Sequence, residues 1–188
     1  VMCYLRLIIN PTDDSAFLRI INTPKRSIGA VTLEKLGGYA QHRGVSLLTA
    51  CSELGLGQAL GQSKALVNLH EFASWLEDHA REILESTDPV PRIRQLLSDI
   101  AYEDYIRETA PTPQGAEARL ENINFLLNSV QGMINKAESE DDKSIETIIR
   151  KLVLIDLLDQ QAEADDSDRV QLMTLHAAKG LEFPHVYM

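Results

Sequence analysis

The chain has 188 residues, of which 44% are hydrophobic and 24% are charged, and its formal net charge is −10 at pH 7. This length allows one sizeable domain, and no run of about 18 apolar residues is present that could cross a membrane. The two cysteines, Cys3 and Cys51, are far apart and belong to no paired-cysteine motif, which favours free thiols in a reducing compartment over a disulfide or metal framework.

The first third of the chain shows short helical patterns separated by Pro, Gly and capping residues. Asn10 and Pro11 are expected to end the first pattern, and Gly44 to close the third. Three glycines in the run 55–64 predict at least one turn there. The expected helices cover residues 4–9, 15–22, 30–43, 47–55 and 63–86.

The remainder is also expected to be helical, with polar and proline-containing loops between the helices. The runs 138–144 and 163–168 are expected to be acidic surface loops. The first alternating, strand-like pattern comes only at 170–175. The expected helices cover residues 93–100, 102–108, 116–136 and 144–160. The fold class expected is therefore mainly α. Both ends of the chain lie inside apolar patterns, so we expect it to be part of a larger protein.

The acidic residues are concentrated in one part of the chain. Residues 82–168 carry 20 acidic and 8 basic side chains, whereas residues 1–81 carry 7 acidic and 8 basic ones. The negative net charge therefore does not exclude a nucleic-acid-binding surface on the first part.

Two stretches contain residues suited to phosphate chemistry. In "NTPKRSIGAVTLEKL", residues 22–36, Lys25 and Arg26 precede a glycine that opens a helix, so two cations lie beside free backbone N–H groups. The alternative reading is an ordinary helix start with two solvated basic residues. In "VQLMTLHAAKGLEF", residues 170–183, a strand-like run breaks into a cluster of His, Lys, Gly and Glu; the alternative is a strand end with ordinary surface residues.

Other catalytic patterns are absent from the sequence. It contains no phosphate-binding loop, no H-E-x-x-H zinc pattern and no nucleophile elbow. The histidines His42, His70 and His79 are expected to be ordinary exposed or half-buried residues, and Phe72 and Trp75 are expected to lie in the core. No catalytic residue and no metal ligand is expected in this chain.

Together the runs "AFLRIINTPKRSIG" and "VQLMTLHAAKGLEFPHVYM", with about 140 helical residues between them, resemble superfamily 1A DNA helicases of the Rep, UvrD and PcrA type, and the Rep branch is the most similar. The resemblance implies that residues 1–24 belong to a RecA-like motor domain called 2A and lead into an insertion in it. It implies that 25–167 form the helical 2B insertion and that 168–188 return to 2A with helicase motif V.

The same resemblance implies roles for individual residues. Motif V would place Thr174, His176 and Lys179 on single-stranded DNA, and Gly180 and Glu182 near the nucleotide. The sites implied for duplex DNA are Lys25, Arg26, Ser27, Ile28 and Gly29, with Ser27 standing where many relatives have glycine.

The function implied is that of a regulatory and duplex-contacting subdomain of a bacterial, cytoplasmic, ATP-dependent 3′→5′ DNA helicase of replication or repair. ATP and Mg²⁺ would be bound by the intact helicase and not by this chain. The expected partners are DNA, the 1A, 1B and 2A domains of the same protein, and replication or repair proteins, without a membrane. Two alternatives stay open: a protein-docking module of the helicase, or a free-standing helical scaffold.

Overall fold

The structure, a computed structural model, describes residues 1–61, 63–164 and 173. Helices are the secondary-structure elements found within these residues, as the sequence predicts. They are α1 (Met2–Ile9), α2 (Asp14–Ile20), α3 (Ala30–Arg43), α4 (Leu47–Ser52), α5 (Leu56–Leu60), α6 (Lys64–Leu84), α7 (Pro89–Asp99), α8 (Tyr102–Thr109), α9 (Pro113–Lys136), α10 (Glu140–Lys143) and α11 (Ile145–Ala164). None of the described helices is long and apolar enough to span a bilayer.

The chain divides into two compact units, Val1–Leu154 and Ile155–Met188. In the second unit the described structure is the final part of α11, which ends at Ala164. The predicted strand at 170–175 lies outside the described residues, except for Met173, which has no regular secondary structure.

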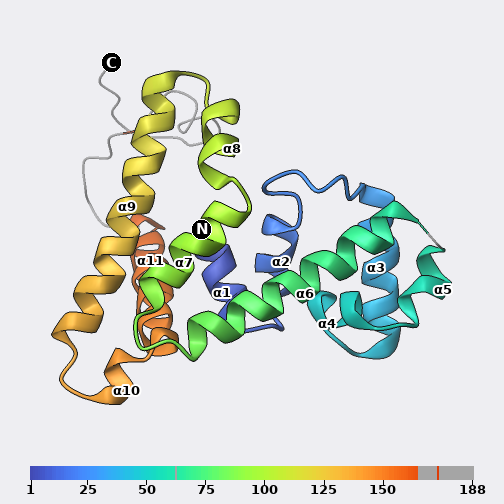
Figure 1. Cartoon of the computed structure of the whole chain (residues 1–188), viewed down its shortest axis with the longest axis horizontal. Helices are drawn as coiled ribbons and strands as arrows, with labels where there is room; N and C mark the ends of the chain where they lie inside the picture. The colour runs from blue at the N-terminus through green and yellow to red at the C-terminus, as the bar shows by residue number, and fades with distance from the viewer. Residues whose placement is uncertain (62, 165–172, 174–188) are drawn as a thin grey trace. The chain divides into compact units, whose positions relative to one another are not determined.

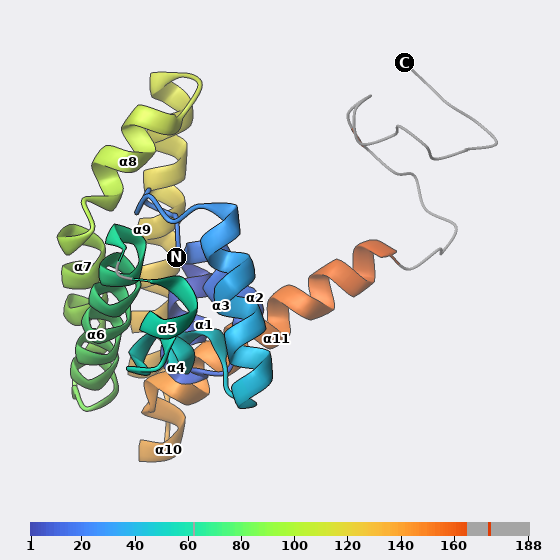
Figure 2. The same ribbon diagram turned by 90° about the vertical axis from the view of Figure 1, so that its right-hand side faces the viewer.

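Helix α6 is the central element of the first unit (Figure 1). It packs against α1, α4, α5 and α7, and the 90° view in Figure 2 also shows α4, α5 and α7 beside it. Its apolar residues recur every three or four positions, which predicts one buried face. Leu66, Leu69, Phe72, Ala73, Leu76 and Ile83 are indeed buried. The long helix predicted over 63–86 is therefore confirmed.

Helices α1 and α2, which the resemblance assigns to the motor domain, contribute to the same core as α3–α9. Tyr4, Leu5 and Phe17 are at most 1% exposed and belong to one hydrophobic cluster with α6. The rings of Phe17 and Phe72 meet edge to face with their centroids 5.9 Å apart. Packing therefore joins residues 1–24 to the helices that follow them.

Polar side chains fix several helix starts. The Asp13 carboxylate accepts the Ala16 N–H at 2.9 Å at the start of α2, and the Arg6 guanidinium donates to the same carboxylate. Ser46 caps α4 by accepting the Thr49 N–H. Gly44 ends α3 in the left-handed conformation with φ of 66°, which glycine adopts without steric cost.

Two short helices occur where the sequence suggested only turns or loops. Helix α5 lies inside the glycine-rich run 55–64, and its Leu56 is fully buried. Helix α10 lies inside the acidic run 138–144, where the Ser139 hydroxyl accepts the Asp142 N–H. A helix of four or five residues has about one turn, which is too short for an apolar residue to recur along it. The sequence signal for these two helices is one leucine for α5 and one capping serine for α10.

Candidate nucleic-acid interface

The stretch with two basic residues forms the connection between α2 and α3, residues 22–29, here called the 22–29 turn (Figure 1). Asn22 organises this turn from its beginning. The Asn22 Oδ1 accepts the N–H of Arg26 at 3.3 Å and of Ile28 at 3.2 Å, and its Nδ2 donates to the Ile28 carbonyl at 2.6 Å. The Thr23–Pro24 peptide bond is cis. One side chain thus spans the whole turn.

Arg26 points into the protein. One guanidinium nitrogen donates to the carbonyl oxygens of Ile20, Ile21 and Pro24 at 2.9, 3.3 and 3.2 Å. The other donates to the Tyr4 hydroxyl at 2.7 Å. The guanidinium of this half-buried residue is therefore engaged with the protein's own oxygen atoms.

Aromatic rings enclose the same guanidinium. Its central carbon lies 4.6 Å from the centroid of the Phe72 ring, 5.9 Å from Trp75 and 6.0 Å from Tyr4. Each ring face attracts a cation. Burial raises the pKa of Tyr4 and the positive charge of Arg26 lowers it, with burial the larger effect. Tyr4 is therefore a neutral hydroxyl at physiological pH, and it also donates to the Thr23 carbonyl at 2.6 Å.

Lys25 has the opposite disposition. Its side chain is exposed, and within the described residues it makes no hydrogen bond or ion pair. Of the two cations predicted to bind phosphate, Lys25 is the one presented to solvent.

The backbone after Lys25 turns sharply into α3. Ser27 is exposed and has a φ of 58°, a left-handed conformation that glycine adopts more readily. Ile28 is buried and anchors the turn. Gly29 is the N-cap of α3 and provides no side-chain cap, so the first N–H groups of α3 have no intrahelical acceptor. The structure thus brings Lys25 and these donors onto one short segment.

A hollow of about 410 Å³ lies next to the turn. Its lining includes Arg26, whose guanidinium is engaged with the protein's own oxygen atoms and aromatic rings, and the two carboxylates of Glu71 and Asp99. Negative groups repel phosphate, so the candidate anion-binding surface is the exposed side of the turn and not this hollow.

His79 differs from the prediction of an exposed or half-buried residue. It is 9% exposed, and its Nε2 lies 3.1 Å from the Asp99 Oδ2. Its ring packs against Trp75 with centroids 4.8 Å apart. The pattern of α6 alone could not reveal this burial, because Asp99 belongs to α7, a separate helix that begins after the loop 85–88. Phe72 is buried as predicted and Trp75 is half-buried.

The second predicted site lies outside the described residues. Thr174, His176, Lys179, Gly180 and Glu182 all fall within 174–188. Among the described residues, no group of three or more His, Cys, Asp or Glu side chains is arranged to hold a metal ion.

Asn22 and Asn68 were not predicted as part of the site. The Asn68 Nδ2 on α6 donates to the Arg26 carbonyl at 2.8 Å across 42 residues of sequence. No local pattern could show such a contact. Asn22 follows a helix and precedes Thr-Pro, which is a usual setting for an asparagine that bonds to nearby backbone.

Comparison with known proteins gives a family over the whole chain. Residues 1–188 match the family described as UvrD-like helicase C-terminal domain. The chain is 43% identical over 188 residues to the ATP-dependent DNA helicase Rep of Salmonella typhimurium, covering 100% of this chain and 27% of that protein. It is 41% identical to the Rep helicase of Escherichia coli over 188 residues, covering 100% and 28%.

The chain is also similar to a DNA helicase of another name. The ATP-dependent DNA helicase PcrA of Bacillus subtilis is 37% identical over 195 residues, covering 100% of this chain and 25% of that protein. The chain thus spans about a quarter of the length of the curated relatives it matches.

Proposed function

Because this chain belongs to the UvrD-like helicase C-terminal domain family, we propose that it is part of an ATP-dependent 3′→5′ DNA helicase and contacts the duplex that this motor unwinds. The observation that carries the proposal is the 22–29 turn, which presents Lys25 and the free start of α3 to solvent. Identity to DNA helicases over the full chain supports it.

The turn is suited to the DNA backbone rather than to the bases. An ammonium group and unpaired backbone N–H groups bind phosphate oxygens, which are the same at every base pair. We therefore propose duplex binding that is independent of sequence and weakens as salt rises. Within the turn, Lys25, Ser27 and Gly29 contribute from the exposed side, and Ile28 anchors it from within.

The motor activity is assigned to the full-length protein. ATP and Mg²⁺ would be bound by other parts of that protein, because this sequence lacks the phosphate-binding loop. The full-length protein would act in a bacterial cytoplasm. Thr174, His176 and Lys179 would contact single-stranded DNA, with Gly180 and Glu182 near the nucleotide. We propose the boundaries 1–24 for the entering 2A segment, 25–167 for 2B and 168–188 for the returning segment.

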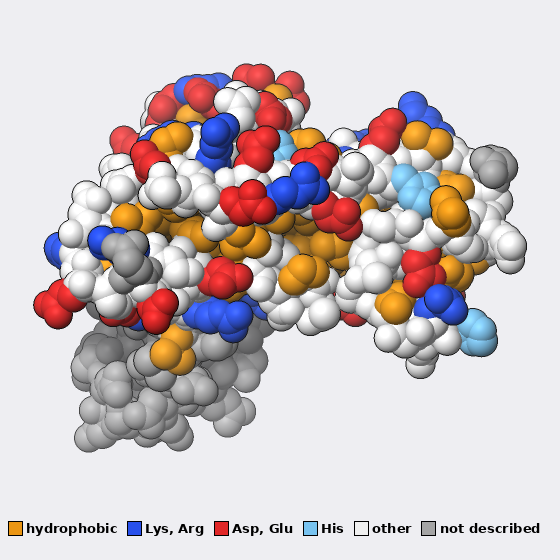
Figure 3. All heavy atoms as spheres, turned by 60° about the horizontal axis from the view of Figure 1, so that its bottom comes forward, with side chains coloured by type: hydrophobic (Ala, Val, Ile, Leu, Met, Phe, Trp, Pro, Cys, Tyr) orange, Lys and Arg blue, Asp and Glu red, His pale blue; other side chains and the backbone are white. Residues whose placement is uncertain are grey.

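One alternative function has an observation in its favour. Residues 82–168 carry the acidic surplus, and Phe125 on α9 is 74% exposed, so an apolar side chain is available there for contact with a partner protein. On the face shown in Figure 3, however, acidic and basic side chains are intermixed around hydrophobic ones, and no large patch of one sign is seen. Duplex contact is the preferred function because the family and the relatives that match the whole chain are helicases by name. Other domains of the same protein and replication or repair proteins are proposed as further partners.

The test is Lys25→Ala in the full-length protein, with equilibrium binding measured on a single-strand–duplex junction and on single-stranded DNA at several salt concentrations. Junction affinity should fall, and the slope of log K against log salt should decrease by about 0.9 for the lost phosphate contact. Single-strand affinity should change less. An unchanged junction affinity and slope would refute the duplex role of Lys25 and favour the docking function.

A further inference from the structure

We propose that Arg26 is a positioning residue that, with Asn22 and Asn68, holds the 22–29 turn in its DNA-binding shape, and that it is not itself a phosphate ligand. This inference rests on the proposed duplex role of the turn. It separates two adjacent cations by function, with Lys25 facing DNA and Arg26 facing the protein.

The hydrogen bonds of Arg26 are directed inward. Its guanidinium bonds to three backbone carbonyls at the end of α2 and in the turn, and to the Tyr4 hydroxyl on α1. A planar guanidinium can make these bonds at once, whereas a lysine ammonium is a compact group with three donors. To reach a DNA phosphate, Arg26 would have to break these bonds and leave the Phe72 ring 4.6 Å away.

The two asparagines hold the turn from either side. Asn22 bonds to the backbone at Arg26 and Ile28, and Asn68 on α6 donates to the Arg26 carbonyl. Each is partly buried. Both side chains are neutral, so neither contributes counterion release on binding DNA. The Asn22 amide already bonds through its oxygen and its nitrogen to the backbone of the turn, so we expect Asn22 to affect duplex affinity through the shape of the turn.

These contacts also explain how the turn keeps an unfavourable backbone. Ser27 has a positive φ, which a non-glycine residue adopts only when its surroundings determine it. The bonds to Arg26 and Ile28 lie immediately on either side of Ser27. We call the hydrogen bonds of Asn22, Arg26 and Asn68 to this turn the clamp. The clamp orders the turn before DNA binds, and preorganisation of this kind lowers the entropic cost of binding.

The experiment compares Arg26→Lys, Arg26→Ala, Asn22→Ala, Lys25→Ala and the double variant Asn22→Ala/Lys25→Ala in the full-length protein. Junction and single-strand DNA affinities are measured across several salt concentrations, and the thermal midpoint of each variant is recorded. Lys136→Ala, which removes an exposed cation of α9 outside the turn, is the matched control and should bind as the wild type does.

The clamp predicts that Arg26→Lys weakens junction binding as much as Arg26→Ala, by about tenfold, because the retained charge cannot rebuild the contacts. It also predicts that Lys25→Ala weakens binding less in the Asn22→Ala background than in the wild type, since a disordered turn no longer places Lys25. The proposal is overturned if Arg26→Lys binds like the wild type while Arg26→Ala lowers the salt slope by about 0.9, which is the behaviour of a phosphate ligand.

If the Arg26 variants do not fold, Asn22→Ala decides the matter. Weaker junction binding with a non-additive response to Lys25→Ala supports the clamp, and wild-type junction binding overturns it. If Lys25→Ala alone has no effect, the phosphate role of Lys25 fails, but the Arg26→Lys comparison still tests the clamp through the backbone donors of the turn.

Discussion

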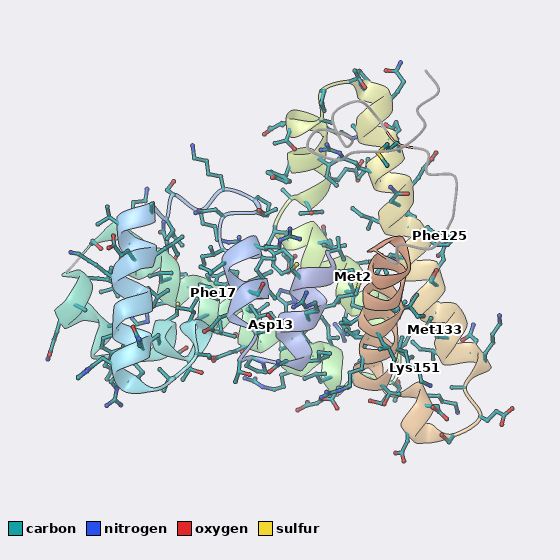
Figure 4. The ribbon with its side chains drawn as sticks, turned by 180° about the vertical axis from the view of Figure 1, so that it is seen from behind. Met2, Asp13, Phe17, Phe125, Met133 and Lys151 are labelled. Carbon is teal, nitrogen blue, oxygen red and sulfur yellow. The ribbon has the colours of Figure 1, made fainter. Side chains whose placement is uncertain are left out.

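Replacing Phe17 by alanine should destabilise the helices that follow residue 24 as well as α2 itself. Phe17 has no exposed surface and meets Phe72 of α6 edge to face. Figure 4 shows it on α2, the helix that Asp13 caps. If residues 1–24 are part of the core, its removal leaves a cavity against α6.

The magnitude follows from burial. Phe→Ala in a core costs about 3–5 kcal/mol, a large fraction of the roughly 5–15 kcal/mol that stabilises a typical domain. With an m-value of about 2 kcal/mol/M in urea, the unfolding midpoint should fall by roughly 1.5–2.5 M. Phe17→Leu, which leaves a smaller cavity, should give a smaller shift in the same direction.

The assay uses the single tryptophan of the sequence, Trp75, as a probe located in α6. Urea unfolding is followed by Trp75 fluorescence and by far-ultraviolet circular dichroism. The control is Phe125→Ala, the same chemical change at a residue of α9 that is 74% exposed and should shift stability by less than about 0.5 kcal/mol. A Trp75 transition unaffected by Phe17→Ala would show that α2 and α6 do not share a core.

Three further predictions follow from single residues. Burial alone would raise the pKa of Asp13, but hydrogen bonds from the Ala16 N–H and from Arg6 outweigh it and hold this pKa below the ordinary 3.8. Asp13→Asn should therefore lower the free energy of unfolding at pH 7, and urea titrations should show the difference shrinking as pH falls through the lowered pKa; a pH-independent difference would contradict this. Ser27→Gly should raise the free energy of unfolding by up to about 1 kcal/mol because glycine accepts the positive φ, and a lower urea midpoint would refute the strain. Burial raises the pKa of Cys51 to about 12, so iodoacetamide at pH 8 should leave Cys51 unmodified in the folded chain and alkylate it in urea; rapid labelling without denaturant would contradict its burial.

Much of the fold could be predicted from the sequence, because long helices carry their signal locally. The spacing of Leu66, Leu69 and Leu76 predicts the buried face of α6 without knowledge of its neighbours. The signal for a helix start is equally local, because the capping residue bonds to an N–H only three residues later, as Ser46 does to Thr49. The short helices α5 and α10 were not predicted, since their formation depends on one buried leucine and one serine cap.

The candidate site could be predicted only in part. The two basic residues before a glycine correctly predicted where the turn lies, and Lys25 lies at its surface. The inward direction of Arg26 depends on Tyr4, 22 residues earlier, and on Phe72, 46 residues later, so it depends on the tertiary fold. The positive φ of Ser27 likewise depends on the contacts around the turn and could not be predicted from the sequence.

The most direct test of the duplex contact is hydrogen exchange at residues 29–32 of the full-length protein, measured free, with single-stranded DNA and with a junction. These residues begin α3, and their N–H groups lack intrahelical acceptors and a side-chain cap. The structure predicts slower exchange at 29–32 with saturating junction DNA and little change with single-stranded DNA. Exchange at 29–32 that is equally fast with and without bound junction would contradict the proposal that this turn holds the duplex.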